Sequence, residues 1–296
     1  MALRTLLALA LAAVCATILA ASGSAITGGQ YDGNGHPFVG LTDNGEFACS
    51  GTLLSPTVML TAAHCFSGST STFGTNSATG APLVRVSFDP NLINTPRDQR
   101  FWQFGTYYAD PSFTPGAGPG LLGFASHDVA LIVFTAAGCT VPSGQNGACG
   151  PIPSATTLGQ YGRLPAQGAV DALAQKAAID IVGFGQQSFV RGGGPCAGPC
   201  SPRLGAAFTR FVAHTTLIAS NDRIASTFIK LQSNNGAVCF GDSGGPDMPA
   251  GTRTVLAVNS FGANAMCTGP SYSYRVDTAE ALGWIGATVQ AHGASL

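Results

Sequence analysis

Short apolar segments, interrupted again and again by Gly, Pro, Asn and Ser, make up most of the chain after residue 25. Six of these segments have the length of β-strands: residues 58–60, 83–88, 129–134, 178–184, 225–231 and 254–261. Forty Gly and eighteen Pro suit an all-β protein with many turns. Only residues 279–292 have the length and apolar spacing of a helix. The pattern predicts a β-sandwich or β-barrel with a terminal helix, and does not choose between them.

Three longer connections are rich in Gly and Pro: residues 110–123, 136–168 and 186–203. We expect them to be surface loops of one domain, not linkers between domains. Hydrophobic residues make up 45% of the chain and charged residues 9%, which is enough to bury a sizeable core. Thirteen Lys and Arg against fourteen Asp and Glu leave no basic surface, so nucleic acid is excluded as a partner.

The first 25 residues have the form of a secretory signal peptide. Arg4 precedes an apolar run over residues 6–21, and small residues follow at 22–25. The alternative is a membrane anchor, but the run is short for a full span. We therefore expect a secreted, extracellular protein without stable membrane association.

Cysteine usage agrees with export. Nine Cys are present, and Cys15 lies within the signal segment, which leaves eight. An even number in an exported chain predicts up to four disulfides.

Four motifs carry the chemistry, at residues 26–29, 49–65, 127–131 and 239–246. A serine hydroxyl is a weak nucleophile unless a base accepts its proton and a third group orients that base. Ser243 lies among glycines that allow a sharp turn, and His64 is the candidate base. Asp128 precedes an apolar segment, where a shielded carboxylate needs a partner.

Each of these residues alone has a structural interpretation: a histidine beside a cysteine, a turn-capping aspartate, a glycine-rich surface loop. Their joint occurrence with matching flanks favours catalysis. The segments around His64, Asp128 and Ser243 resemble those of the chymotrypsin/trypsin family, and the similarity extends from Ile26 to Trp284 in the final helix. The chain order His, Asp, Ser also differs from that of α/β-hydrolases and of subtilisin-like enzymes.

The resemblance implies a fold of two packed six-stranded antiparallel β-barrels with a C-terminal helix. The protease domain would span residues 26–296, with the boundary between its barrels at roughly 145–170. His64, Asp128 and Ser243 would form a catalytic triad for peptide-bond hydrolysis, and the backbone N–H groups of Gly241 and Ser243 an oxyanion hole. No metal or organic cofactor is expected.

In the family, a freed α-amino group pairs with the aspartate before the nucleophile. Ile26 and Asp242 would form this activation pair. Because Ala25 is a plausible signal-peptidase site, we expect export itself to release the active N-terminus. Cleavage at Ala20 or Ala21 would instead leave a stub that needs a second cut.

The resemblance also implies the disulfides Cys49–Cys65 and Cys239–Cys267. The remaining four cysteines allow three connectivities. We expect the local pairs Cys139–Cys149 and Cys196–Cys200.

The family's primary specificity pocket maps onto Ala237 and Val238 at its base. The strand with Ser260, Phe261 and Gly262 would line the pocket, and Ser271 would narrow it modestly. Ala237 stands where trypsin-like enzymes have an aspartate, so an uncharged residue before the scissile bond is expected.

The expected partners are protein or peptide substrates and protein protease inhibitors, and the expected state is a monomer. Two alternatives stay open. A catalytically silent homologue would act as a binding module, although such proteins usually lose the His or the Ser. An esterase could use the same triad. The departures from the family pattern, Thr27 and Phe184 among them, do not touch the chemistry.

Overall fold

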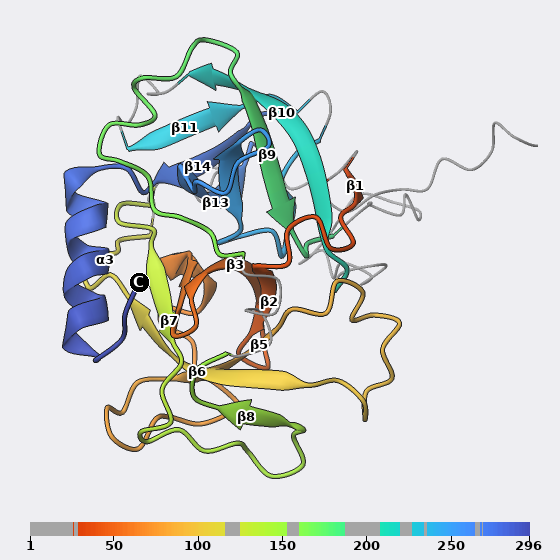
Figure 1. The fold of residues 1–296 in the computed structure, drawn as a ribbon, viewed down its shortest axis with the longest axis vertical. Helices are drawn as coiled ribbons and strands as arrows, with labels where there is room; N and C mark the ends of the chain where they lie inside the picture. Colours follow the sequence, from red (N-terminus) through yellow and green to blue (C-terminus); the bar gives the residue numbers. More distant parts are fainter. Residues whose placement is uncertain are drawn as a thin grey trace, which may run out of the picture.

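The structure is a computed structural model that describes residues 26, 29–115, 125–152, 160–186, 208–219, 227–233, 236–263, 267 and 269–296. Its strands form two sheets, each closed on itself (Figure 1). The expected fold class is confirmed: two closed six-stranded antiparallel barrels with a C-terminal helix.

The first barrel has the strand order β5-β2-β3-β4-β7-β6, and pairing of β5 with β6 closes it. A seventh strand, β8, adds to β6 in parallel. The strands are β2 (Val39–Asp43), β3 (Ala48–Ser55), β4 (Val58–Thr61), β5 (Leu83–Ser87), β6 (Trp102–Ala109), β7 (Ala130–Val133) and β8 (Gly147–Cys149).

The second barrel has the order β10-β11-β14-β13-β12-β9, closed by pairing of β9 with β10. The N-terminal strand β1 pairs with the start of β10. The strands are β1 (Gln30–Tyr31), β9 (Ala178–Gly183), β10 (Phe211–Ala219), β11 (Phe228–Leu231), β12 (Pro246–Pro249), β13 (Ala257–Gly262) and β14 (Ser271–Arg275).

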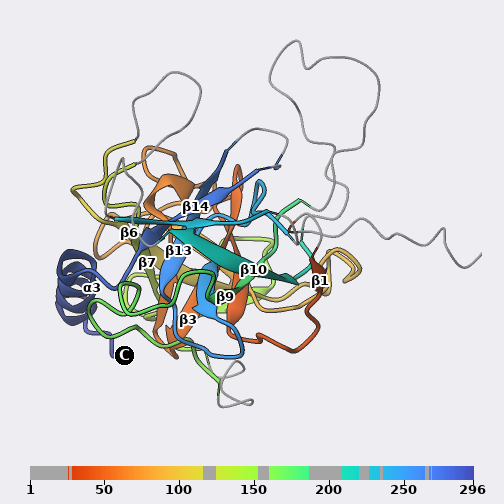
Figure 2. The same ribbon diagram turned by 90° about the horizontal axis from the view of Figure 1, so that it is seen from above.

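Helix α3 (Ala279–Ala291) runs beside the two barrels (Figures 1 and 2). Its N-cap is Thr278, whose hydroxyl accepts a hydrogen bond from the N–H of Ala281 at 3.1 Å. The predicted periodicity is confirmed, because Ile285 and Val289 are buried against the barrels. No helix within the described residues is long and apolar enough to span a membrane.

Several strands carry no clear signal in the sequence. β6 and β10 contain Gly105, Thr106, His214 and Thr215 at positions that interrupt an apolar pattern. Gly105 has a packing reason: a Cβ there would lie 2.5 Å from Cγ2 of Ile132 on the neighbouring β7. At this position the close approach of β7, and not an alternation of apolar residues, therefore limits which residue β6 can carry.

One hydrophobic cluster joins the barrels, because it contains Val182, Phe184 and Phe228 of the second barrel together with first-barrel residues such as Phe104 and Leu131. A separate cluster fills the second barrel. The barrels therefore pack as one body, and residues at their junction are fixed relative to each other.

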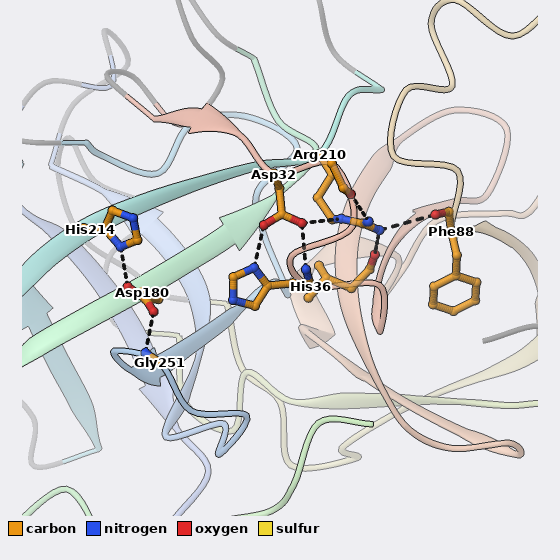
Figure 3. A network of polar contacts seen from close by, with 9 residues as sticks. Asp32, His36, Phe88, Asp180, Arg210, His214 and Gly251 are labelled. Atoms are coloured by element: carbon orange, nitrogen blue, oxygen red, sulfur yellow. Dashed lines mark hydrogen bonds and ion pairs between the residues drawn. The ribbon is translucent and has the colours of Figure 1, made fainter. Parts of the chain in front are cut away.

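A buried ion pair also links the N-terminal segment to both barrels (Figure 3). Nε of Arg210 donates to Oδ2 of Asp32 at 2.8 Å, and both side chains are almost completely buried. Nη1 of Arg210 donates to the carbonyls of Val39 and Phe88 in the first barrel. Nδ1 of His36 lies 2.5 Å from Oδ1 of Asp32. A second contact on β9 joins Asp180 to His214 and Gly251.

Candidate active site

His64 and Asp128 meet because of the pairing of β4 with β7. Thr61 at the end of β4 is the direct partner of Ala130 at the start of β7. His64 lies three residues after Thr61 in a 3₁₀ turn, and Asp128 lies two residues before Ala130. Both side chains therefore lie at the same end of the first barrel.

The histidine ring is oriented by the carboxylate. Nδ1 of His64 lies 2.8 Å from Oδ2 of Asp128, and the backbone N–H of His64 donates to Oδ1 at 2.9 Å. A third donor, the hydroxyl of Ser260, lies 2.5 Å from Oδ2. Both oxygens of Asp128 are therefore hydrogen-bonded. Because Nδ1 of His64 faces the carboxylate, Nε2 on the other side of the ring faces away from it.

Asp128 and His64 differ in exposure, and their pKa values shift in opposite directions. The Asp128 side chain is 0% exposed, whereas 30% of the His64 side chain is exposed. Burial alone would raise the pKa of Asp128, but the positive charge and hydrogen bonds of His64 outweigh it and lower that pKa. Burial would lower the pKa of His64, but Asp128 raises it overall. The pair therefore favours an imidazolium beside a carboxylate.

The turn that carries His64 is braced on two sides. The Tyr107 hydroxyl donates to the carbonyls of Ala62 and Ala63, at 3.1 and 2.7 Å. A disulfide joins Cys49 to Cys65. These contacts fix the backbone on either side of the ring.

The Ser243 loop packs against this same segment. The N–H of Ser50 donates to the Ser243 carbonyl at 2.8 Å, and the Ser50 hydroxyl donates to the Gly241 carbonyl at 2.8 Å. Gly244 has φ +78°, and a Cβ there would lie 2.8 Å from the backbone nitrogen of Ala62. The Ser243 loop can approach the His64 turn this closely only with glycine at 244.

Ser243 itself is partly exposed. Its hydroxyl donates no hydrogen bond to His64 within the described part of the chain, a separation common in ligand-free sites. The N–H groups of Gly241 and Ser243 have no acceptor among the described residues. Gly241 has φ +99°, a left-handed conformation that glycine adopts without strain and that leaves its amide free for an incoming oxygen.

The Asp242 carboxylate is hydrogen-bonded to two backbone N–H groups. Oδ1 accepts from the N–H of Gly185 at 2.8 Å and Oδ2 from the N–H of Cys239 at 2.9 Å. Burial nevertheless raises the pKa of Asp242 to about 7. Ile26 is buried in the same apolar cluster as Val238, four residues before Asp242.

The predicted pocket residues differ in burial and belong to the second barrel or to the segment before Asp242. Ala237 and Val238 are buried, and Phe261 and Gly262 are half-buried. The Phe261 ring stacks on Tyr272 at 4.8 Å between centroids. Ser271 pairs with Gly262 across β13 and β14.

Ser260 has a role that sequence reasoning missed. We expected it to line the pocket, but its hydroxyl is directed to Asp128. The only sequence signal for this contact is its place in the strand before the pocket, which does not indicate the direction of its side chain.

Two further disulfides join Cys239 to Cys267 and Cys139 to Cys149. The expected pair Cys196–Cys200 lies outside the described residues. Within the described residues, no group of three or more His, Cys, Asp or Glu side chains could hold a metal ion.

Comparison with known proteins agrees with this geometry. The family model described as Trypsin matches residues 25–285. The chain belongs to the trypsin family. A comparison with curated proteins finds no match.

Solved structures of this family share the fold. Human heparin binding protein superimposes with a TM-score of 0.58 at 18% identity, over 91% of this chain and 99% of that one. A structure named HL collagenase gives 0.57 at 20%, covering 90% and 98%. Mouse neuropsin, a serine protease of the limbic system, gives 0.56 at 18%, covering 87% and 96%. At these identities the likeness shows the fold alone.

Proposed function

We propose that this trypsin-family protein is a secreted serine endopeptidase that uses Ser243 as nucleophile. The observation that carries the proposal is the 2.8 Å contact between Nδ1 of His64 and the fully buried carboxylate of Asp128. This contact lies on the same turn against which the Ser243 loop packs. The arrangement supplies a nucleophile, an oriented base and free amide donors at one place.

In the proposed reaction, Oγ of Ser243 attacks the scissile carbonyl carbon while Nε2 of His64 accepts the hydroxyl proton. The carbonyl oxygen becomes an oxyanion, which the amides of Gly241 and Ser243 stabilise. The C–N bond then breaks, and His64 returns its proton to the leaving amine. Water then attacks the acyl carbon while His64 accepts a proton from it. The bond between the acyl carbon and Oγ breaks, His64 returns the proton to Oγ, and the acid product leaves with the Ser243 hydroxyl restored.

Two features of the site favour this transition state. The pKa of His64 is raised by Asp128, so the imidazolium formed during attack is stabilised where it forms. Each oxyanion donor is worth about 2.7–4 kcal/mol in enzymes of this mechanism.

Activation follows from the N-terminus. We infer that signal peptidase removes residues 1–25 and exposes the α-amino group of Ile26, which pairs with Asp242. Two backbone N–H groups and no cation face the Asp242 carboxylate among the described residues, and its pKa is raised to about 7. An amino group beside it would restore its charge and order the oxyanion loop.

N-terminal sequencing of the exported protein tests this step. The expected first residue is Ile26, and acetylation of its amine should abolish activity. A mature chain that begins at Ala21 or Ser22 and is fully active would overturn it.

Sequence reasoning from Ala237 predicts an uncharged side chain before the scissile bond. That preference is expected if Ala237 and Val238 alone set it. The buried carboxylate of Asp247, in the same barrel, argues against an uncharged side chain at that position.

We expect a monomer, with protein protease inhibitors as further partners.

A fluorophosphonate, which labels activated serines, tests the nucleophile directly. We expect one label per chain on Ser243, located by mass spectrometry, and none in Ser243→Ala or His64→Ala. Absence of labelling in a chain that begins at Ile26 would favour a silent binding module. An esterase would be labelled equally, so relative rates on matched ester and amide substrates separate it from a peptidase.

A further inference from the structure

The interior of the second barrel contains a group of polar side chains. Strands β12, β13 and β14 are neighbours in the sheet. In their register Asp247 is opposite Ala257 and Asn259 is opposite Ser273, and Ser271 is two residues from Ser273 on β14. Directly opposite residues of antiparallel strands share a face, as do alternate residues of one strand. Asp247, Asn259, Ser271 and Ser273, which we call the polar patch, therefore share one face.

This face is the inside of the barrel. Asp247 is also opposite Ile181 on β9, and Ser273 and Ser271 are opposite Ile229 and Leu231 on β11. Those three apolar residues and Ala257 belong to the hydrophobic cluster of the second barrel. The polar patch is therefore surrounded by core residues.

The polar patch is buried but not internally satisfied. Asp247, Ser271 and Ser273 are 0% exposed and Asn259 is 1% exposed. Among the described residues, neither oxygen of Asp247 has a hydrogen-bond partner, nor has Nδ2 of Asn259 or the hydroxyl of Ser271. Inside the patch, the Ser273 hydroxyl donates to Oδ1 of Asn259 at 3.3 Å.

An unpaired carboxylate in a barrel core is costly, so its presence requires an explanation. Burial raises the pKa of Asp247 to about 8, and the nearby Ser273 hydroxyl lowers it only in part. Arg275 of β14, a cation on the same face, forms ion pairs with Asp171 and Asp277. Asp247 is thus a carboxylate without a counter-ion within the described residues.

The polar patch adjoins the predicted specificity pocket. Val238, at the expected pocket base, packs in the same cluster as Ala257 and Ile181, the two strand partners of Asp247. Ser271 belongs both to the patch and to the predicted pocket wall. Ala237, Ser271 and Ser273 all have small side chains.

We propose that Asp247 is the specificity-determining residue of this protease and pairs with the cationic side chain of a Lys or Arg that precedes the scissile bond. This inference rests on the proposed proteolytic function. The carboxylate would act from β12, ten residues after Ala237 and on a different segment of the chain. Hydroxyl and amide groups of the polar patch would complete the hydrogen bonds of the bound cation.

The direct test compares peptide substrates that differ only in having Lys, Arg, Phe or Leu before the scissile bond. The wild type is expected to prefer Lys and Arg. Asp247→Asn should lower kcat/KM for these two by about 10²-fold, the worth of a charge-assisted hydrogen bond, and leave Phe and Leu within a few-fold. Asp98→Asn, a change at an exposed aspartate that has no contact with the polar patch, is the control and should change neither.

Binding of benzamidine, an amidinium probe, to Ser243→Ala separates this inference from the proposed reaction, because it requires no catalysis. Affinity should rise about tenfold per pH unit and level off above about pH 8, since the cation binds the ionised Asp247. Asp242 and His64 also titrate nearby, so the pH dependence must vanish in Ser243→Ala with Asp247→Asn to be assigned to Asp247.

Three results would overturn the inference. Preference for Phe or Leu in the wild type would show that Ala237 and Val238 set an uncharged pocket. An equal loss on all substrates in Asp247→Asn would show a structural role. Benzamidine affinity unchanged by Asp247→Asn would place the cation elsewhere. If no substrate is cleaved but benzamidine binding depends on Asp247, the proposed proteolytic function is wrong, whereas the assignment of Asp247 as a cation-binding residue is supported.

Discussion

The hydroxyl of Ser260 lies 2.5 Å from the Asp128 oxygen that also faces the His64 ring. Ser260 comes from β13 of the second barrel, whereas His64 and Asp128 come from the first. The hydrogen bond therefore crosses the junction between barrels and couples the orientation of His64, through Asp128, to β13 of the second barrel. Ser260 is a positioning residue that acts through Asp128.

Replacing Ser260 with Ala should lower kcat by about tenfold, because a hydrogen bond to a charged group is worth about 1.5–3 kcal/mol. KM should change little. Ser260→Thr, which keeps a hydroxyl, should restore most of the rate, and Ser87→Ala, a buried serine of β5, should have no effect. A KM effect without a kcat effect would mean that Ser260 contacts substrate only.

Activity should rise with pH through the pKa of His64, because the neutral imidazole is the base. Asp128 raises that pKa above 6.5, so the acid limb of kcat/KM should lie above 6.5. The profile should be measured on a peptide with an uncharged side chain before the scissile bond, so that ionisation of Asp247 does not change substrate binding.

Asp128→Asn should move this limb to lower pH and reduce kcat by roughly 10⁴-fold, a magnitude carried over from well-studied members of the family. A limb that stays at the same pH in Asp128→Asn would contradict the electrostatic role given to Asp128.

The buried pair of Arg210 and Asp32 should contribute strongly to stability. Removing one partner leaves a buried unpaired charge, so Arg210→Met should lower the free energy of unfolding by about 3–5 kcal/mol in urea denaturation. Asp98→Asn, a change at an exposed aspartate, is the control and should stay within about 0.5 kcal/mol.

The same pair predicts a pH dependence of stability. Burial alone would raise the pKa of Asp32, but His36 and Arg210 outweigh it and lower the pKa from 3.8. Its stabilisation is therefore present above pH 3.8 and is lost as the pH falls through the depressed value. Equal acid sensitivity of wild type and Asp32→Asn would contradict this.

The fold implied by the motifs is confirmed, whereas the apolar pattern alone located only some of the strands. The segments around His64, Asp128 and Ser243 carry specific motifs, and the contact between His64 and Asp128 agrees with the arrangement that they imply. Apolar runs located β4, β5, β7, β9 and α3 to within a few residues. By contrast, β6 and β10 are defined by strand pairing and contain polar residues that hide them from a periodicity search.

Asp247 shows the clearest limit of sequence reasoning. An Asp after Gly-Gly-Pro has the appearance of a turn residue, and nothing in the local sequence indicates burial. Only the pairing of β12 with β9 and β13 places it inside the barrel. Side-chain direction in a closed sheet depends on register, which is set by contacts between residues far apart in the chain.

The central claim is proteolysis through Ser243. Its most direct test is incubation of a diverse peptide library with the exported protein, confirmed to begin at Ile26, beside a Ser243→Ala control. We expect cleavage by the wild type that disappears in the control. Equal cleavage in both samples, or no cleavage by the wild type, would contradict it.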